Sequence, residues 1–287
     1  MAQSKQQILA HLEAAGSRPR HRFGQNFMID QNLVRLIAEA GELTGADHAL
    51  EVGPGTGTLT EELLTRAARV TACEIDRDLS ALLRDRYAGE AKFTLVEGDV
   101  LAGKHALAEA VVASLSDARD AGLVNKLVAN LPYNIASPLV VELLLAGVEL
   151  LAFTVQKEVA DRLRASPGGK DYGPLTVTVQ LLGRVEVLRT ISPGAFWPPP
   201  KIDSALVRIR RDDRLGTRAR DVSRFVQQLF SMRRKTLRRA LSSAVPDVEA
   251  DAALAKAGLN PTDRPETASP EALLRLWGFT AGRPGRA

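Results

Sequence analysis

The stretch 127–135 combines residue types that could hold a flat base with an exocyclic amine. Residues 127–129 are apolar and indicate the end of a buried strand, and Asn130, Pro132 and Tyr133 follow at once. In open α/β sheets, ligands bind at the carboxyl ends of the strands. There an amide oxygen can accept from an amine N–H, and an aromatic ring can stack on the base. The same residues would also suit an ordinary turn, with proline fixing φ and asparagine capping, so the rest of the chain must decide.

A glycine-rich loop, Glu51-Val-Gly-Pro-Gly-Thr-Gly57, follows the first predicted strand, His48–Val52, and precedes a predicted helix, Thr58–Ala67. Glycines such as Gly53 and Gly55 allow a tight turn and a close approach of the backbone to a ligand. The dinucleotide fingerprint would require another glycine at position 58, which is threonine here. The loop alone therefore predicts a nucleotide-like cofactor without selecting one.

Acidic side chains end the next two predicted strands, Arg69–Cys73 and Phe93–Val96. Glu74 could accept hydrogen bonds from both hydroxyls of a ribose, and it disfavours a cofactor with a 2′-phosphate. Asp99 could accept from the amine of adenine, although a Gly-Asp pair is also common in turns. Together the two acids favour a cofactor that contains adenosine.

Strands and helices alternate up to about residue 211, which indicates an α/β fold. The remaining runs of β type are Lys126–Ala129, Leu150–Val155, Arg184–Ile191 and Ile202–Arg210. Helices are predicted over Gln3–Ala15, Asp30–Ala40, Lys104–Asp120 and Ser137–Ala146, and from Gln156. The rest is predicted to be helical, over Asp221–Leu241, Val248–Ala257 and Ser269–Trp277. We therefore expect a catalytic domain over residues 1–211 and a smaller, all-helical domain over residues 212–287, with a disordered end from Thr280.

Composition excludes several classes of protein. The apolar fraction of 45% and the charged fraction of 25% are those of a globular chain that can bury a full core. The single cysteine, Cys73, excludes an internal disulfide framework and fits a reducing compartment. We see no signal peptide, no apolar run long enough to span a membrane and no zinc-type Cys/His spacing. We therefore expect a cytoplasmic protein with no membrane partner and no metal. We also expect a monomer, although none of these features bears on the oligomeric state.

Positive charge is concentrated near the C-terminal end. Residues 208–239 contain twelve Lys/Arg and three Asp, a net charge of +9, so with +4 overall the remainder carries −5. Such asymmetry favours a polyanionic partner, nucleic acid in particular, although a solvated basic helix face would have the same composition. The candidates for contact with phosphate are Arg233, Arg234, Lys235 and Arg238.

Several motifs occur in the order of one family. They are Phe23-Gly-Gln-Asn-Phe27, the glycine loop, Glu74-Ile-Asp76, Asn130-Leu-Pro-Tyr-Asn-Ile135, Gln156-Lys-Glu158 and Phe196-Trp-Pro-Pro-Pro-Lys-Ile-Asp-Ser204. The chain resembles the ribosomal RNA adenine N6-dimethyltransferases, most closely their small-subunit branch. The resemblance runs from Arg20 to Ser204 and more loosely to Trp277. Each motif alone is weak, and the combination is specific.

The resemblance implies a class I, Rossmann-like methyltransferase fold that uses S-adenosylmethionine. It also implies the substrate: two adjacent adenosines in the 3′-terminal hairpin of small-subunit (16S) ribosomal RNA, each dimethylated at N6 during ribosome biogenesis. Met28 departs mildly from the leucine usual in the family, and Trp197 stands at a variable position. The positions that match the family's cofactor-binding residues are Asn26, Met28, Gly53, Glu74, Asp99 and Asn130.

The chemistry suggests how the motif would act. The lone pair of adenine N6 is delocalised into the ring and is a poor nucleophile. We expect the Asn130 side-chain oxygen and the Leu131 carbonyl to accept from the two N–H bonds and to stabilise the developing charge. Tyr133 would stack on the flipped base, and Phe196 would help to hold it. No strong general base is needed, because the methylated amine becomes acidic once it forms.

Three other functions remain open at this point. A large-subunit methyltransferase of the macrolide-resistance type would share the catalytic motifs. A ribosome-assembly factor could keep the fold without the activity, although the intact motifs disfavour this. A nicotinamide-dependent dehydrogenase is disfavoured by Thr58 and by the absence of a proton-relay residue.

Overall fold

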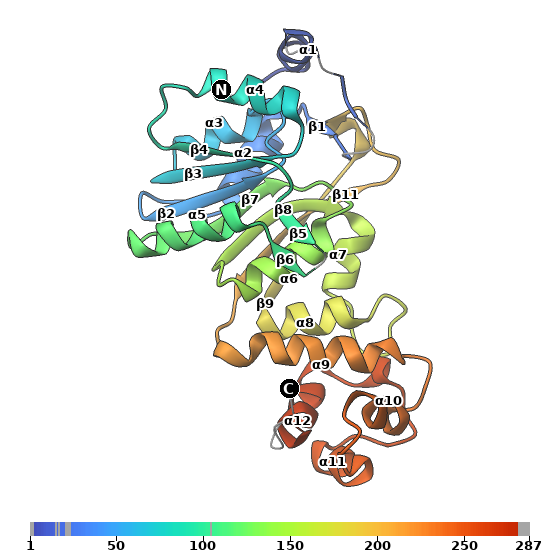
Figure 1. Cartoon of the computed structure of the whole chain (residues 1–287). Coiled ribbons are helices and arrows are strands. Elements are labelled where there is room, and N and C mark those ends of the chain that lie inside the picture. The colour runs from blue at the N-terminus through green and yellow to red at the C-terminus, as the bar shows by residue number, and fades with distance from the viewer. Residues whose placement is uncertain (1–2, 15, 17, 21–23, 104, 281–287) are drawn as a thin grey trace. The chain divides into compact units, whose positions relative to one another are not determined.

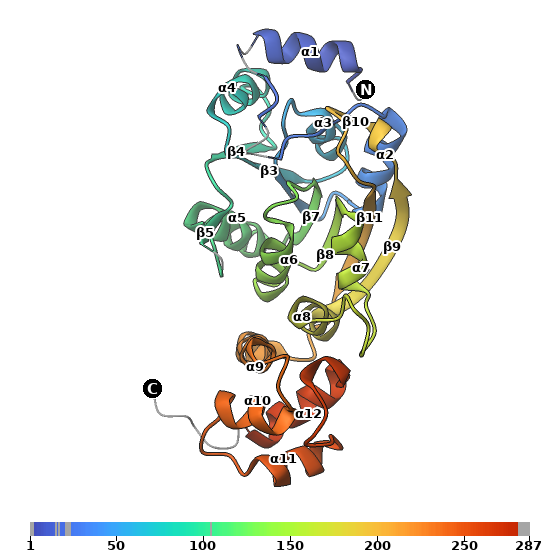
Figure 2. The ribbon, with the colours of Figure 1, turned by 90° about the vertical axis from the view of Figure 1, so that its right-hand side faces the viewer.

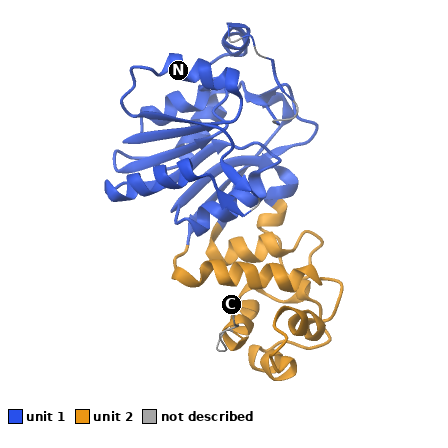
Figure 3. Cartoon of the chain, viewed as in Figure 1, with its two compact units in different colours: residues 1–160, 185–211 blue, residues 161–184, 212–287 orange. Residues whose placement is uncertain are grey.

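The computed structural model describes residues 3–14, 16, 18–20, 24–103 and 105–280, and the C-terminal end that we expect to be disordered lies almost wholly outside this part. The chain forms two compact units (Figure 3). Unit 1 consists of Met1–Ala160 and Val185–Arg211, and unit 2 of Asp161–Arg184 and Asp212–Ala287. The chain therefore crosses between the units at residue 211, where the sequence indicates a boundary, and also on both sides of residues 161–184.

Unit 1 is built on a seven-stranded sheet with the order β4-β3-β2-β7-β8-β11-β9 (Figure 1). β2 pairs in parallel with β3 and β7, β3 with β4, and β7 with β8, whereas β11 runs antiparallel to β8. The expected α/β class is confirmed, and each predicted strand is present. The bounds are β2 Asp47–Val52, β3 Arg69–Glu74, β4 Phe93–Glu97, β7 Val124–Asn130, β8 Leu150–Gln156, β9 Gly183–Ile191 and β11 Ser204–Arg211.

Helices cover both faces of this sheet, as the near-continuous apolar runs of its parallel strands require. Figures 1 and 2 show α2 on one face and α5 and α6 on the other. Asp30 caps α2, since its carboxylate accepts from the N–H groups of Asn32 and Leu33. The helices are α2 Gln31–Ala40, α3 Thr58–Leu64, α4 Arg77–Arg86, α5 Glu109–Asp120, α6 Ala136–Leu145 and α7 Lys157–Leu163.

The N-terminal segment packs beside the sheet. Helix α1 (Lys5–Ala14) buries Ile8 and Leu12 against Phe27 and Leu79. The strands β1 (Phe27–Met28) and β10 (Phe196–Trp197) then form a separate antiparallel pair. The N-terminal loop, which contains Asn26 and leads into β1, is thus joined by backbone hydrogen bonds to the proline-rich arm, residues 196–200. The two segments are about 170 residues apart in sequence.

The helix predicted over Lys104–Asp120 is wrong at its start. It begins at Glu109, and a short hairpin of β5 (Leu101–Gly103) and β6 (Ala106–Leu107) precedes it. The Asp99 carboxylate accepts from the Leu101 N–H, which fixes the turn into the hairpin. Lys104 itself lies outside the described residues.

Unit 2 is helical. Its α8 (Pro174–Leu182), α9 (Ala219–Ser231), α10 (Leu237–Ala244), α11 (Ala250–Ala257) and α12 (Pro270–Thr280) pack on one another. The Tyr172 hydroxyl donates to the Ala268 carbonyl at 2.7 Å, and the Tyr172 ring lies 6.3 Å from that of Phe230, centroid to centroid. Within the described part of the chain, no helix combines the length and the apolarity needed to cross a bilayer.

The single helix predicted over Asp221–Leu241 is also wrong, because the chain turns between α9 and α10. Thr236 caps the new helix, and its hydroxyl accepts from the Arg239 N–H. The Leu237 N–H, at the start of that helix, donates to the carbonyl of Asp263 at 2.6 Å. The periodic pattern continues through the break, which is why the sequence does not reveal it. The break places residues 233–235 in an exposed turn.

A buried polar network ties the amino ends of β2 and β7 to β3 and α5. His48 is fully buried, and its Nδ1 lies 2.7 Å from Asn125 Oδ1. Because Asn125 Nδ2 donates to the Leu115 carbonyl, its oxygen faces His48, so His48 Nδ1 carries the proton. The Thr71 hydroxyl then donates to His48 Nε2 at 2.8 Å. Both ring nitrogens of the neutral imidazole therefore have a hydrogen-bond partner. Burial lowers the pKa of His48.

Because the pKa of His48 is lowered by burial, this network should make the free energy of unfolding fall as the pH is lowered. In the unfolded chain His48 takes up a proton below about pH 6.5, whereas the folded protein resists that proton. The contribution to the free energy of unfolding is therefore present above about pH 6.5 and is lost as the pH falls below it. Urea unfolding at pH 7.5 and 5.5 should show a smaller drop for His48→Gln than for the wild type. Equal drops in the two proteins would contradict this.

Candidate active site

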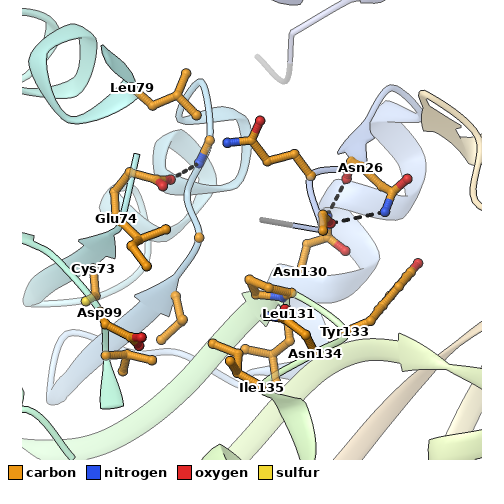
Figure 4. A pocket seen from close by; sticks show the side chains of 18 of the residues that line it. Asn26, Cys73, Glu74, Leu79, Asp99, Asn130, Leu131, Tyr133, Asn134 and Ile135 are labelled. Atoms are coloured by element: carbon orange, nitrogen blue, oxygen red, sulfur yellow. Dashed lines mark hydrogen bonds between the residues drawn. The ribbon is translucent and has the colours of Figure 1, made fainter. Parts of the chain in front are cut away.

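A pocket lies at the carboxyl edge of the sheet (Figure 4). Its walls are the loops that follow β2, β3, β4 and β7, together with the N-terminal loop. Parallel strands deliver their carboxyl ends to one edge, so loops distant in sequence meet there. The lining residues include Gly24, Gln25, Asn26, Phe27, Gly53, Gly55, Cys73, Glu74, Ile75, Leu79, Asp99, Asn130, Leu131, Pro132, Tyr133 and Asn134.

All but two of the predicted catalytic and cofactor-binding residues line this pocket. The two exceptions are Met28 and Phe196, which face the hydrophobic core with 6% and 2% of their surface exposed. They are partners in the β1–β10 pair, so their side chains share one face of it. Those that line the pocket are Asn26, Gly53, Gly55, Glu74, Asp99, Asn130, Leu131 and Tyr133.

The two glycines of the loop that line the pocket, Gly53 and Gly55, are required on steric grounds. Gly53 has φ +71°, and a Cβ there would lie 3.2 Å from Pro132 Cγ. Gly55 has φ +61°, and a Cβ there would lie 2.9 Å from Phe27 Cε1. Both conformations are unfavourable for other residues. The loop thus packs tightly against two other walls of the pocket while presenting bare backbone to a ligand.

Glu74 is the buried acid of the pocket. Its carboxylate accepts from the N–H groups of Gly55 at 3.2 Å and Asp76 at 2.9 Å. Burial raises the pKa of Glu74 to about 7, although the two backbone N–H groups oppose that rise. Asp99 is exposed at the pocket rim, and its Oδ1 accepts from the Leu101 N–H at 2.9 Å. Asp99 therefore stabilises a turn and also lines the pocket, so the two interpretations of the Gly-Asp pair do not exclude each other.

The Asn130 amide is fixed by hydrogen bonds at both ends. Its Nδ2 donates to the Asn26 carbonyl at 2.9 Å, and its Oδ1 accepts from the Thr154 hydroxyl at 2.5 Å. A carbonyl can only accept, so the nitrogen must face Asn26 and the oxygen must face Thr154. Nothing in the sequence points to Thr154, because its proximity follows from the β7–β8 register, which pairs it with Asn130.

Tyr133 is half-buried beside Asn130, and its hydroxyl lies 2.7 Å from Ser204 Oγ. Burial raises the pKa of Tyr133, and the Ser204 bond opposes this. The phenol is therefore neutral at ordinary pH and offers the pocket its ring face and not a phenolate base.

The N-terminal loop is anchored to the start of α4. Arg20 forms an ion pair with the buried Asp76 carboxylate at 3.0 Å, and Gln25 Nε2 donates to the same carboxylate at 3.1 Å. The Asp76 carboxylate also caps α4 (Arg77–Arg86) by accepting from the Asp78 N–H. This anchor holds the wall that carries Asn26. Residues 21–23, which include Phe23 of the predicted motif, lie outside the described residues.

Behind this wall, the Trp197 ring stacks on Phe27 at 6.5 Å between centroids. The proline-rich arm thus supports the pocket from the rear. Among the described residues, no cluster of three or more His, Cys, Asp or Glu side chains could hold a metal ion.

Comparison with known proteins identifies the family of this chain. The family model for "Ribosomal RNA adenine dimethylase" matches residues 16–281. The chain belongs to that family. The ribosomal RNA small subunit methyltransferase A of Pseudomonas aeruginosa is 42% identical over 275 residues, covering 93% of this chain and 97% of the relative. The protein of the same name from Parasynechococcus marenigrum is 40% identical over 91% of this chain and 87% of the relative.

Two solved structures are also similar. The 23S rRNA methyltransferase ErmE has a TM-score of 0.62 and 30% identity, and the match covers 89% of this chain and 100% of that one. A dimethyladenosine transferase from Plasmodium falciparum has a TM-score of 0.69 at 22% identity over 89% of this chain and 98% of that one, which supports the fold alone. The expected class I methyltransferase fold is confirmed.

As a member of this family the chain is a methyltransferase with S-adenosylmethionine as its cofactor, and the residues present fit that cofactor. Glu74 offers a buried carboxylate for two ribose hydroxyls. Asp99 offers an exposed carboxylate for an adenine amine. Gly53 and Gly55 line the pocket and have no side chain, so a ligand can approach their backbone closely. The individual roles of these residues stay predictions.

The raised pKa of Glu74 gives a test of its role. Only the carboxylate can accept from both ribose hydroxyls, so affinity should rise as Glu74 ionises through about pH 7. Methylthioadenosine is a suitable probe, because it has the adenine and the ribose but lacks the titrating α-amino group. Calorimetry should give a Kd about tenfold lower at pH 8 than at pH 6. Glu74→Gln should bind more weakly and without that pH dependence. A wild-type Kd that does not change with pH would remove Glu74 from the ribose.

Proposed function

We propose that this protein dimethylates N6 of two adjacent adenosines in the 3′-terminal hairpin of small-subunit (16S) ribosomal RNA, in the cytoplasm and as a monomer, during ribosome biogenesis. The observation that carries this is the fixed amide of Asn130 beside the ring of Tyr133, at a pocket that fits an adenosine-containing cofactor. An acceptor and a flat apolar face are what an adenine amine and its ring require.

The pocket residues would activate the amine without a base. S-adenosylmethionine, when bound, supplies a methyl group on a sulfonium, which is already an excellent leaving group. The Asn130 oxygen and the Leu131 carbonyl would accept from the two N–H bonds of adenine N6 and favour the charge that appears on nitrogen. The proton leaves to water after transfer, since the methylated amine is acidic. Much of the remaining acceleration would come from alignment of the amine with the methyl group.

The aromatic side chains of Tyr133 and Phe196 would contribute to substrate binding in different ways. Tyr133 would stack on the flipped base, a contact worth about 1–3 kcal/mol. Phe196 is buried in the same core cluster as Met28. It would support the N-terminal loop by packing and would not touch the base. Met28 would likewise support the N-terminal loop through packing.

Unit 2 would supply contacts to the RNA backbone. Arg233, Arg234 and Lys235 are exposed in the turn between α9 and α10, and within the described residues none of the three forms an ion pair. Arg238, on α10, forms an exposed ion pair with Asp251 at 2.6 Å. A phosphate of the RNA could displace Asp251 from Arg238, because exposed ion pairs contribute little to the stability of the fold.

The other part of the basic segment is engaged within unit 1. Arg208 and Arg210 form ion pairs with Glu42, and Arg208 also with Glu186. Arg211 pairs with Glu149 at 3.0 Å. The charge excess between residues 208 and 239 is therefore divided between a neutralised cluster in unit 1 and exposed cations in unit 2.

The choice of subunit is supported by the relatives. The proteins named small subunit methyltransferases are about 40% identical to this chain, whereas the large-subunit enzyme ErmE is 30% identical. Incubation with under-methylated small subunits and labelled cofactor, followed by mapping of the modified bases, tests the proposal. Label on two neighbouring adenosines is the expected result. Label on large-subunit RNA, or on none, would overturn it.

Asn130→Ala should lower turnover by about 10²- to 10³-fold, because it removes an acceptor that acts on developing charge. The measurement is methyl transfer to under-methylated small subunits at saturating cofactor. Asn32→Ala, an exposed residue of α2 outside the pocket, is the matched control and should retain full activity. Turnover of folded Asn130→Ala close to wild type would exclude the proposed role.

Replacing Arg233, Arg234 and Lys235 with Gln should weaken the salt dependence of RNA binding. The slope of log K against the logarithm of the salt concentration should become less negative by about 2 to 3. The measurement is fluorescence anisotropy with a labelled hairpin across a salt series. Gln at Arg66, Arg84 and Arg210, which are ion-paired in unit 1, removes the same charge and should leave the slope nearly unchanged. Equal slopes in the two triple variants would mean that the α9–α10 turn does not contact phosphate.

A further inference from the structure

The strand β8 contains one buried hydroxyl among apolar side chains. Its sequence is Leu-Leu-Ala-Phe-Thr-Val-Gln, and Thr154 is fully buried between Phe153 and Val155, which are fully buried as well. A hydroxyl in such surroundings destabilises the fold unless it has a partner. Its hydrogen bond goes to Asn130 Oδ1 at 2.5 Å, at the pocket edge. A valine would fill the same space without that requirement.

We propose that Thr154 is a positioning residue, which holds the Asn130 amide in the plane that methyl transfer requires. The proposal rests on the proposed function, because it assigns to Asn130 the role of acceptor for the substrate amine. Thr154 itself does not line the pocket. It would act only through Asn130.

The need for a second support follows from the asparagine side chain. Its last torsion is broad, with no deep staggered well, so one hydrogen bond leaves the amide plane free to swing. The Asn26 carbonyl holds Nδ2 from one side, and Thr154 holds Oδ1 from the other. Two hydrogen bonds at opposite ends of the amide fix its plane.

Counting of donors and acceptors supports this arrangement. An amide oxygen has two lone pairs and its nitrogen two hydrogens. Thr154 uses one lone pair, and Asn26 uses one hydrogen. One lone pair then remains for the substrate amine. A threonine hydroxyl is suited to this task because its own proton points at the amide and it brings no charge.

The register of the sheet makes the contact rigid. Asn130 and Thr154 are direct partners in the parallel β7–β8 pair, so the donor is held by the same backbone that holds the acceptor. β11 then covers the other side of β8, where Leu206 opposes Thr154. The support is therefore part of the sheet and does not depend on a loop.

Three substitutions separate the hydroxyl from the shape of the side chain. Thr154→Ser keeps the hydroxyl, Thr154→Val keeps the shape, and Thr154→Ala loses both. We expect kcat to fall about 10- to 100-fold in the Val and Ala variants, because a misaligned acceptor affects the reacting geometry. Thr154→Ser should restore kcat to within about threefold of wild type. Kd for methylthioadenosine, the probe for the adenine and ribose positions, should be unchanged in all three, which a general loss of structure would not produce.

A double-mutant cycle shows whether Thr154 acts through Asn130. Thr154→Val in an Asn130→Ala background should cause no further loss of kcat, since the group it orients is absent. Thr71→Val is the matched control, because Thr71 is an equally buried threonine of β3 that is hydrogen-bonded within the His48 network. It should lower stability and leave kcat unchanged.

The outcomes are distinct. Normal kcat in folded Thr154→Val or Thr154→Ala, or a further loss of the same size in the Asn130→Ala background, overturns the positioning role while the proposed function stands. A wild-type protein that transfers no methyl group to small-subunit RNA overturns both. If Thr154→Val does not fold, the comparison of Ala with Ser decides, because these two differ by the hydroxyl.

Discussion

The orientation of a single amide is the constraint on which the rest of the site depends. Asn130 closes β7 at the carboxyl edge of the sheet, and its two ends are held by Asn26 and Thr154. One support comes from the N-terminal loop and the other from the neighbouring strand. Without both, the oxygen that we propose as the acceptor for the substrate amine would have no fixed direction. A neutral acceptor is effective only when it is preorganised, since it has no charge to compensate for poor geometry.

The surrounding structure can be understood as the means of holding those supports. Asn26 lies in a loop that Arg20 and Gln25 anchor to the buried carboxylate of Asp76. The same loop continues into β1, which the proline-rich arm pairs through β10. The glycine loop passes so close to Phe27 that any side chain at Gly55 would collide with it. Segments from both ends of unit 1 therefore converge on one wall of the pocket.

The sequence predicts the parts of this arrangement that local chemistry determines. Apolar runs identify the parallel strands, Asp30 identifies the start of α2, and the order of the strands places Glu74, Asp99 and Asn130 at one edge. The burial of Met28 and Phe196 could not be predicted, because it follows from the pairing of β1 with β10, which are far apart in the chain.

Other misses have similar causes. Thr154 gives no local signal, since its role depends on strand register. The break between α9 and α10 interrupts no apolar periodicity, and the assignment of residues 161–184 to unit 2 depends on tertiary packing that includes the Tyr172 contact with Ala268.

The electrostatics of the pocket agree with chemistry that needs no base. Tyr133 is held neutral, Asn26 and Asn130 do not titrate, and the Glu74 carboxylate accepts from the backbone N–H groups of Gly55 and Asp76. The most direct test is the single-turnover rate constant for methyl transfer at saturating cofactor and RNA between pH 6.5 and 9. The account predicts a rate constant that stays within about twofold across this range. A rise of about tenfold per pH unit would require a general base at the reacting amine, and it would contradict the account.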